Sequence, residues 1–73
     1  MRNQPNQTPT TMTTLKEFMN SAWKATYING YGEVRNKRVT YGSLPDIQFT
    51  VLGNEGEILI SAKWMFENNV TFQ

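Results

Sequence analysis

Apolar and polar residues alternate most regularly over residues 46–66, in two runs joined by a turn with a glycine at each end. A loop over residues 53–56 predicts an antiparallel hairpin in which Val51 faces Ile58, and this register gathers apolar side chains on one face. A slip of one residue would move every side chain to the other face, so we expect the register to hold. Gly56 suits the positive φ that closes such a loop. Further along, the same register pairs Phe49 with Ile60 and Ile47 with Ala62.

The segment after the hairpin admits two interpretations. The period-two pattern continues through Trp64 and Phe66, which favours an extended strand, whereas a short helix over residues 61–68 is the alternative. We prefer the strand, followed by a turn in which Asn69 adopts a left-handed conformation. A last short strand over residues 70–72 then pairs Phe66 with Val70 and Trp64 with Phe72.

The pattern also predicts a helix ahead of the hairpin. Thr14 and Glu17 form a capping box, in which the hydroxyl accepts from the third helical amide and the carboxylate reaches back. Gly30 is a stop signal. Residues 23–28 also alternate at period two, so the helix ends either at this glycine or near Lys24, with an extended segment after it. The apolar residues at helical spacing are Leu15, Phe18, Met19, Ala22 and Trp23.

The remaining segments are less regular. Residues 33–41 predict either one strand or a tight hairpin that turns at residues 36–37. Residues 42–45 predict a connector, because their proline lacks a ladder amide. Residues 1–13 are polar and cannot bury enough apolar surface to offset their ordering entropy. We expect a disordered polar arm there and a single domain over residues 14–73.

Together these elements predict an α+β fold, with one N-terminal amphipathic helix packed on a small antiparallel sheet of three to five strands. A chain of 73 residues allows one domain, and such a domain buries only about 60% of its surface. The expected core consists of Leu15, Phe18, Met19, Ala22, Trp23, Ile47, Phe49, Val51, Ile58, Ile60, Trp64 and Phe72.

Composition argues against several kinds of site. The chain has no Cys and no His, so it lacks thiolate ligands and the usual proton shuttle. Asp46, Glu55 and Glu57 lack the spacing of a calcium loop, and we interpret them as solvated turn residues. We therefore expect no enzyme activity, no cofactor and no metal. The sequence also lacks a membrane span and the apolar core of a signal peptide, so we expect a soluble cytoplasmic protein.

Charge is divided unevenly along the chain. Residues 1–45 carry six Lys or Arg and two Asp or Glu, whereas residues 46–73 carry one Lys and four Asp or Glu. Such asymmetry suits electrostatic docking on a charged partner, although charged loops also serve solubility. The positive charge concentrates in a basic and aromatic segment, whose candidate partner-binding residues are Tyr31, Arg35, Lys37, Arg38 and Tyr41.

Two binding hypotheses follow. The first is a protein-interaction module, because an open strand edge can take up a partner strand, and Leu52 and Leu59 form a candidate patch on the polar face of the hairpin. The second is a single-stranded nucleic-acid binder, because basic residues with interleaved tyrosines are typical of such proteins. The acidic second half of the chain would repel phosphate, which favours the first hypothesis.

The chain has a polar arm rich in Thr, Asn and Gln, no Cys or His, and one small domain. In this overall character it resembles the small RNA-polymerase-binding transcription regulators of lytic Xanthomonas phages. The resemblance implies a non-enzymatic protein, a monomer or small oligomer, that docks on a host RNA polymerase subunit in the infected cell and alters initiation or termination. An inhibitor of another host protein, such as a defence nuclease, is the alternative.

Overall fold

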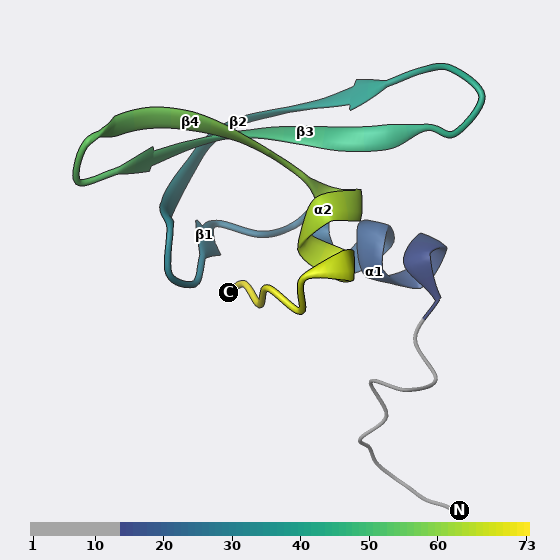
Figure 1. Ribbon diagram of the computed structural model, residues 1–73, viewed down its shortest axis with the longest axis horizontal. Helices are drawn as coiled ribbons and strands as arrows, with labels where there is room; N and C mark the ends of the chain where they lie inside the picture. The colour runs from purple at the N-terminus through teal and green to yellow at the C-terminus, as the bar shows by residue number, and fades with distance from the viewer. Residues whose placement is uncertain (1–13) are drawn as a thin grey trace, which may run out of the picture.

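A computed structural model describes residues 14–73, so the polar arm expected over residues 1–13 lies outside the described residues. Within these residues the chain forms two helices and four strands. Figure 1 shows the three long strands as a curved layer above the helices, with the C-terminal segment near β1. In chain order the elements are α1, Leu15–Ala22; β1, Tyr27–Ile28; β2, Gly32–Thr40; β3, Asp46–Gly53; β4, Gly56–Ser61; and α2, Ala62–Glu67.

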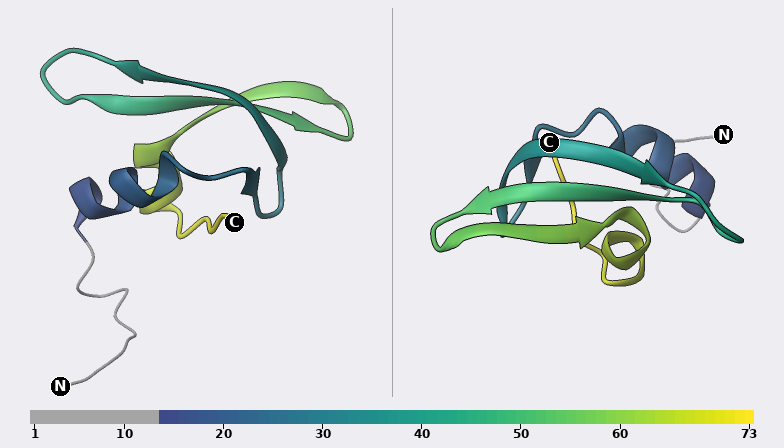
Figure 2. Two further views of the ribbon diagram at one scale, coloured as in Figure 1. Left: turned by 180° about the vertical axis from the view of Figure 1, so that it is seen from behind. Right: turned by 90° about the horizontal axis from the view of Figure 1, so that it is seen from above.

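The four strands form one antiparallel sheet in the order β1-β2-β3-β4. Both helices lie on the same side of this sheet, and β2, β3 and β4 run side by side when seen from above (Figure 2). The predicted α+β class and small antiparallel sheet are therefore confirmed. The prediction of a single N-terminal helix lying on the sheet is not supported, because α2 is the helix that contacts β3 and β4, whereas α1 packs chiefly against α2.

The register predicted for the β3–β4 hairpin is confirmed, since Val51 pairs with Ile58. Gly53 pairs with Gly56, which has a φ of 112°, so the turn itself is shorter than the predicted four-residue loop. The ladder also pairs Phe49 with Ile60 and ends at Gln48 with Ser61, so the expected pair of Ile47 with Ala62 does not form.

The side chains of β3 define two faces of the sheet. The covered face, which is turned toward the helices, carries the buried side chains Ile47, Phe49 and Val51. The open face carries Gln48, Thr50 and Leu52.

β2 is one continuous strand, so the alternative of a hairpin within this segment is wrong. Its register shifts at Arg35, the extra residue of a bulge. Beyond the bulge, Lys37 lies opposite Phe49 and therefore on the covered face. Arg38 lies opposite Gln48 and therefore on the open face. Successive side chains of a strand point to opposite faces, and the bulge determines that Lys37, and not Arg38, faces the helices.

The segment after β4 is a helix, so the preferred prediction of a continuing strand is wrong and its helical alternative is confirmed. Ser61 is the N-cap, and its Oγ accepts a hydrogen bond from the amide of Trp64 at 3.1 Å. A carboxylate oxygen of Asp46 accepts a second amide of the first turn, that of Lys63, at 3.1 Å. Two side-chain oxygens therefore satisfy helix amides that have no partner within the helix. The buried side chains of α2 are Ala62 and Met65.

The capping box predicted at the start of α1 is confirmed. The Glu17 amide donates to Oγ1 of Thr14 at 3.1 Å, and the Thr14 amide donates to Oε1 of Glu17 at 3.0 Å. The helix ends at Ala22 with Trp23 as its C-cap, which is the earlier of the two predicted ends. The chain then becomes extended and forms β1.

The last residues cover the short strand β1. Phe72 forms an isolated antiparallel bridge with Ile28, and the Gln73 amide donates to the carbonyl of Tyr27 at 2.8 Å. The prediction that the C-terminal strand pairs with an extension of β4 is therefore wrong. Asn69 does adopt the predicted left-handed conformation, with a φ of 56°.

The core lies between the covered face and the helices, and it agrees with the expected core in part. The buried apolar residues are Ala22, Ala25, Ile28, Ile47, Phe49, Val51, Ile60, Ala62 and Met65. Half-buried side chains from the expected set are Leu15, Phe18, Met19 and Phe72. Three residues expected in the core are substantially exposed, namely Trp23 at 40%, Ile58 at 45% and Trp64 at 39%.

Candidate protein-binding surface

The five residues proposed to bind a partner are spread over the whole length of β2. Tyr31 precedes the strand and Tyr41 follows it. At about 3.3 Å per residue, the two tyrosines lie roughly 30 Å apart, which is too far for one compact site. The structure therefore does not bring the basic and aromatic segment together, and a binding role for its residues stays a prediction.

Lys37 is engaged within the protein. Its ammonium group donates to the carbonyl oxygen of Trp23, at the C-cap of α1, and lies 5.1 Å from the centre of the indole ring. A cation at a helix C-terminus compensates the partial negative charge of the last carbonyls, and the indole adds a cation–π contact. These contacts give Lys37 a structural role.

The two arginines have weaker partners. Arg35 forms an ion pair with Glu33, with 3.6 Å between Nη1 and Oε1, and both side chains are more than half exposed. Arg38 donates to Oε1 of Gln48 at 3.0 Å on the open face. Exposed pairs of this kind add little stability, so both guanidinium groups remain accessible to an acidic surface.

The two edges of the sheet differ. At one edge, the C-terminal segment covers β1, and β2 carries the bulge at Arg35 and two further cations. A bulge and charged side chains are devices that discourage another strand from pairing. At the other edge, β4 has no neighbouring strand within the described residues. Its sequence, Gly-Glu-Ile-Leu-Ile-Ser, contains none of these devices except the single charge of Glu57.

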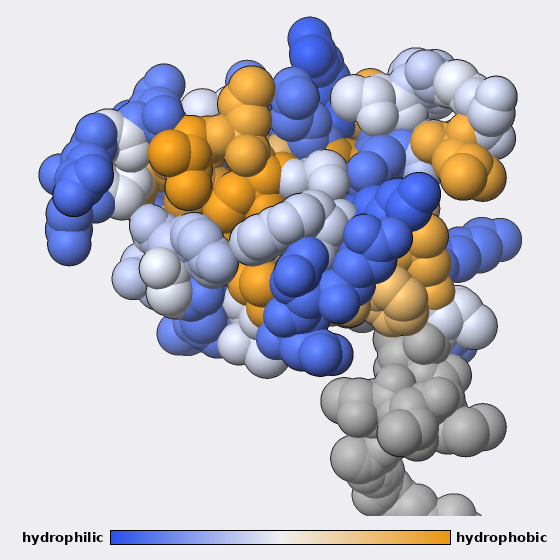
Figure 3. All heavy atoms as spheres, in the orientation of Figure 1, coloured by the Kyte–Doolittle hydropathy of each residue, from blue (hydrophilic) through white to orange (hydrophobic). Residues whose placement is uncertain are grey.

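Apolar side chains gather along the open edge. Leu59 is 64% exposed, although it lies in the middle of a strand. Figure 3 shows the apolar surface over β4, on the side turned toward the viewer. Contiguous apolar surface of this kind marks interaction sites more often than scattered exposed residues do. We define the edge surface as Tyr31, Leu52, Ile58, Leu59 and Trp64, all of which are more than a third exposed.

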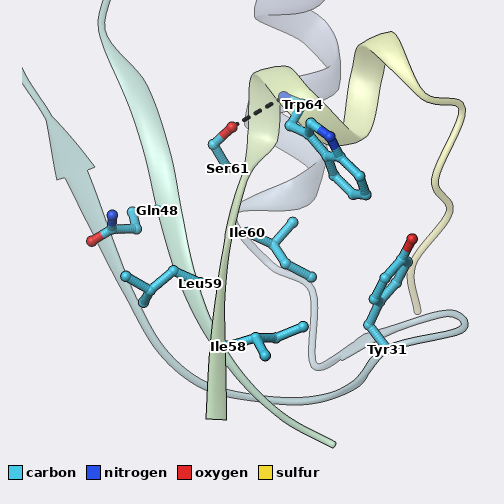
Figure 4. Close-up of a pocket in the computed structure, with 7 residues that line it drawn as sticks. All are labelled: Tyr31, Gln48, Ile58, Leu59, Ile60, Ser61 and Trp64. Carbon is cyan, nitrogen blue, oxygen red and sulfur yellow. Dashed lines mark hydrogen bonds between the residues drawn. The ribbon is translucent and has the colours of Figure 1, made fainter.

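The edge surface has two sides, because successive side chains of β4 point to opposite faces. On the covered side, Ile58 points toward Tyr31 and Trp64, which stand beyond the strand (Figure 4). The rings of these two aromatic residues meet edge to face, with 5.8 Å between their centres. On the open side, Leu59 lies near Gln48. These residues line one shallow hollow beside the unpaired strand, together with Ile60 and Ser61.

Local structure fixes the two aromatic residues. Trp64 lies in the first turn of α2, which the Ser61 hydroxyl holds by the hydrogen bond drawn in Figure 4. The Tyr31 amide donates to the carbonyl of Ile28 at 2.9 Å, and Gly32, with a φ of 148°, then turns the chain into β2. Sequence reasoning missed this pair because it placed Trp64 in a strand and in the core.

No group of three or more His, Cys, Asp or Glu side chains is placed to hold a metal ion within residues 14–73. Neither of the two helices described is long and apolar enough to cross a membrane.

Comparison of the chain with models of known protein families, with curated proteins and with solved structures finds no match.

Proposed function

We propose that the protein is a regulator that acts by binding another protein, and that the edge surface is its contact site. The observation that carries the proposal is the open edge of β4, flanked by exposed apolar side chains on both faces. Exposed strand edges favour unwanted pairing, and the opposite edge of this sheet carries protection. The lack of protection on β4 is therefore best explained by a partner that uses it.

The resemblance to phage transcription regulators directs the proposal to a bacterial RNA polymerase. Docking on one polymerase subunit in the cytoplasm of an infected cell would alter initiation or termination without any chemistry by the regulator itself. Nucleic-acid binding is less well supported, because Lys37 is engaged with Trp23 and the acidic second half of the chain would repel phosphate. A gel shift at low salt, where phosphate contacts are strongest, tests that reading directly.

The proposal is tested by binding of the tagged protein to purified bacterial RNA polymerase. Leu59→Asp places a charge in the edge surface and is expected to weaken binding at least about ten-fold, because a desolvated charge opposes an apolar interface. Leu44→Asp is the matched control, since Leu44 is 73% exposed in the β2–β3 connection, away from β4. Equal binding by the two variants would contradict the edge surface as the contact site, and no binding by the unmodified protein would contradict polymerase as the partner.

If polymerase is not bound, the same pair of variants applied to a lysate pull-down decides whether another host protein, such as a defence nuclease, is the partner. A partner that uses the edge surface binds Leu59→Asp more weakly than it binds Leu44→Asp.

A further inference from the structure

The backbone of β4 presents unused hydrogen-bonding groups at regular positions. In an antiparallel ladder, alternate residues exchange both hydrogen bonds with the neighbouring strand, and the residues between them direct theirs outward. Counted from the pair of Gly53 with Gly56 that closes the turn, the outward residues are Glu57 and Leu59. An extended chain laid beside β4 would meet these backbone groups.

The side chains beside β4 suit such a chain. An added strand places alternate side chains on the two faces of the sheet. On the covered face they would meet the hollow formed by Tyr31, Ile58 and Trp64, which an aliphatic side chain fits. On the open face they would lie near Leu59, where a small polar or aliphatic side chain suffices.

The charges beside β4 indicate which type of residue the incoming strand carries at one of its ends. Glu55 and Glu57 lie at the turn end of β4, and neither forms an ion pair with a described cation. A basic side chain on the incoming strand would compensate them. In an antiparallel addition, which matches every pairing already in the sheet, the C-terminal end of the incoming strand reaches this position.

We infer that β4 takes up an extended segment of the partner protein as a fifth, antiparallel strand. The segment carries an aliphatic residue for the Tyr31–Trp64 hollow and a basic residue at its C-terminal end, beside Glu57. This inference rests on the proposed function and specifies the chemistry of the partner. It identifies Tyr31 and Trp64 as the residues that select the anchoring side chain.

Two short blocked peptides test the inference. Both alternate valine and threonine and contain one lysine, which stands at the C-terminal end in one and at the N-terminal end in the other. Amide resonances of the isotope-labelled protein are followed by NMR during each titration. We expect the largest shifts and slowed hydrogen exchange at Glu57 and Leu59, and a roughly three-fold preference for the C-terminal lysine, as an exposed ion pair provides.

Variants separate backbone pairing from side-chain contact. Leu59→Pro removes the outward amide, which an edge position tolerates, and is expected to reduce peptide affinity more than ten-fold. Leu59→Ala keeps the amide and is expected to lose much less affinity for the peptide. Glu57→Gln leaves the backbone intact and is expected to abolish the preference between the two peptides, so it decides the orientation even if the proline variant does not fold.

Three results would overturn the inference: no shift with either peptide, shifts centred on β1 and β2, or concentration-dependent shifts of β4 without peptide, which would make a second copy of this chain the occupant. Measurement of polymerase binding separates failure of the proposed function from failure of the strand-addition inference. If Leu59→Asp abolishes polymerase binding while neither peptide binds β4, the contact surface stands and strand addition is wrong. If the peptides bind while no protein partner distinguishes Leu59→Asp from Leu44→Asp, the proposed function is wrong.

Discussion

The carboxylate of Asp46, the first residue of β3, accepts a hydrogen bond from the amide of Lys63 in the first turn of α2. The same oxygen also accepts the amide of Ile47, at 2.7 Å. Asp46 therefore fastens the start of one strand to the start of the helix that follows the neighbouring strand. This contact sets where β4 stops pairing and where Trp64 projects beside the edge surface.

Removal of the Asp46 carboxylate is expected to destabilise the protein. Asp46→Ala leaves two amides without their acceptor and should lower the free energy of unfolding by about 1–2 kcal/mol, as the loss of a helix cap does. Asp46→Asn retains one acceptor oxygen and should lose less. Urea unfolding followed by circular dichroism measures both changes. An Asp46→Ala variant as stable as the unmodified protein would show that water replaces the carboxylate.

Lys37 is expected to contribute to stability through Trp23. Lys37→Met keeps most of the aliphatic stem and removes the ammonium, so it should cost about 1 kcal/mol of unfolding free energy. Lys24→Met is the control, because it removes an exposed cation for which the structure records no ion pair. Equal unfolding free energies for the two variants would show that Lys37 has no structural role.

Gly32 is expected to tolerate no side chain. A Cβ at this position would lie 2.1 Å from the carbonyl oxygen of Leu52, and the φ of 148° is strained for any other residue. Gly32→Ala should therefore cost about 3 kcal/mol or more, a large share of the stability of so small a domain. Gly42→Ala is the matched control, because nothing lies within 4 Å of its Cβ position. Thermal unfolding compares the two, and similar midpoints would contradict the close approach.

The accessible arginines provide a test of electrostatic docking. If the partner surface is acidic, the double change Arg35→Glu with Arg38→Glu should weaken partner binding, and more strongly at low salt, while circular dichroism stays unchanged. Lys16→Glu with Lys24→Glu changes the net charge equally, in α1 and just after its C-cap, and serves as the control. Unaltered affinity in the first variant would mean that the two arginines serve only solubility and protection of the β2 edge.

The sequence predicted correctly those elements that depend on residues only a few positions apart. The capping box of Thr14 and Glu17 and the register that pairs Val51 with Ile58 both depend on short-range spacing. The switch from strand to helix at Ser61 depends in part on Asp46, which is distant in sequence. The period-two pattern through Trp64 favoured a strand, although the spacing of Ala62 and Met65 also agrees with a helix.

The candidate site was harder to predict than the fold. The bulge at Arg35 reverses which residues of β2 face the helices, so three neighbouring cations that look like one patch point to different surroundings. The exposure of Trp64 could not be read from its apolar character, because large aromatic residues are rarely buried completely. Alternation indicated Leu52 and Leu59 as an exposed patch, and it predicted an open strand edge without specifying which one. The identity of the edge was missed because the last strand was expected beside the extension of β4.

The covering of β1 by the C-terminal residues, together with the bulge in β2, has a consequence for stoichiometry. Within residues 14–73, β1 pairs only with Gly32 and Glu33, so the rest of the outer edge of β2 is protected by its bulge and its charged side chains. A strand is therefore expected to join β4 in preference to β2, and this preference disfavours the linking of copies in series. We therefore expect complexes that contain equal numbers of the two partners rather than fibres.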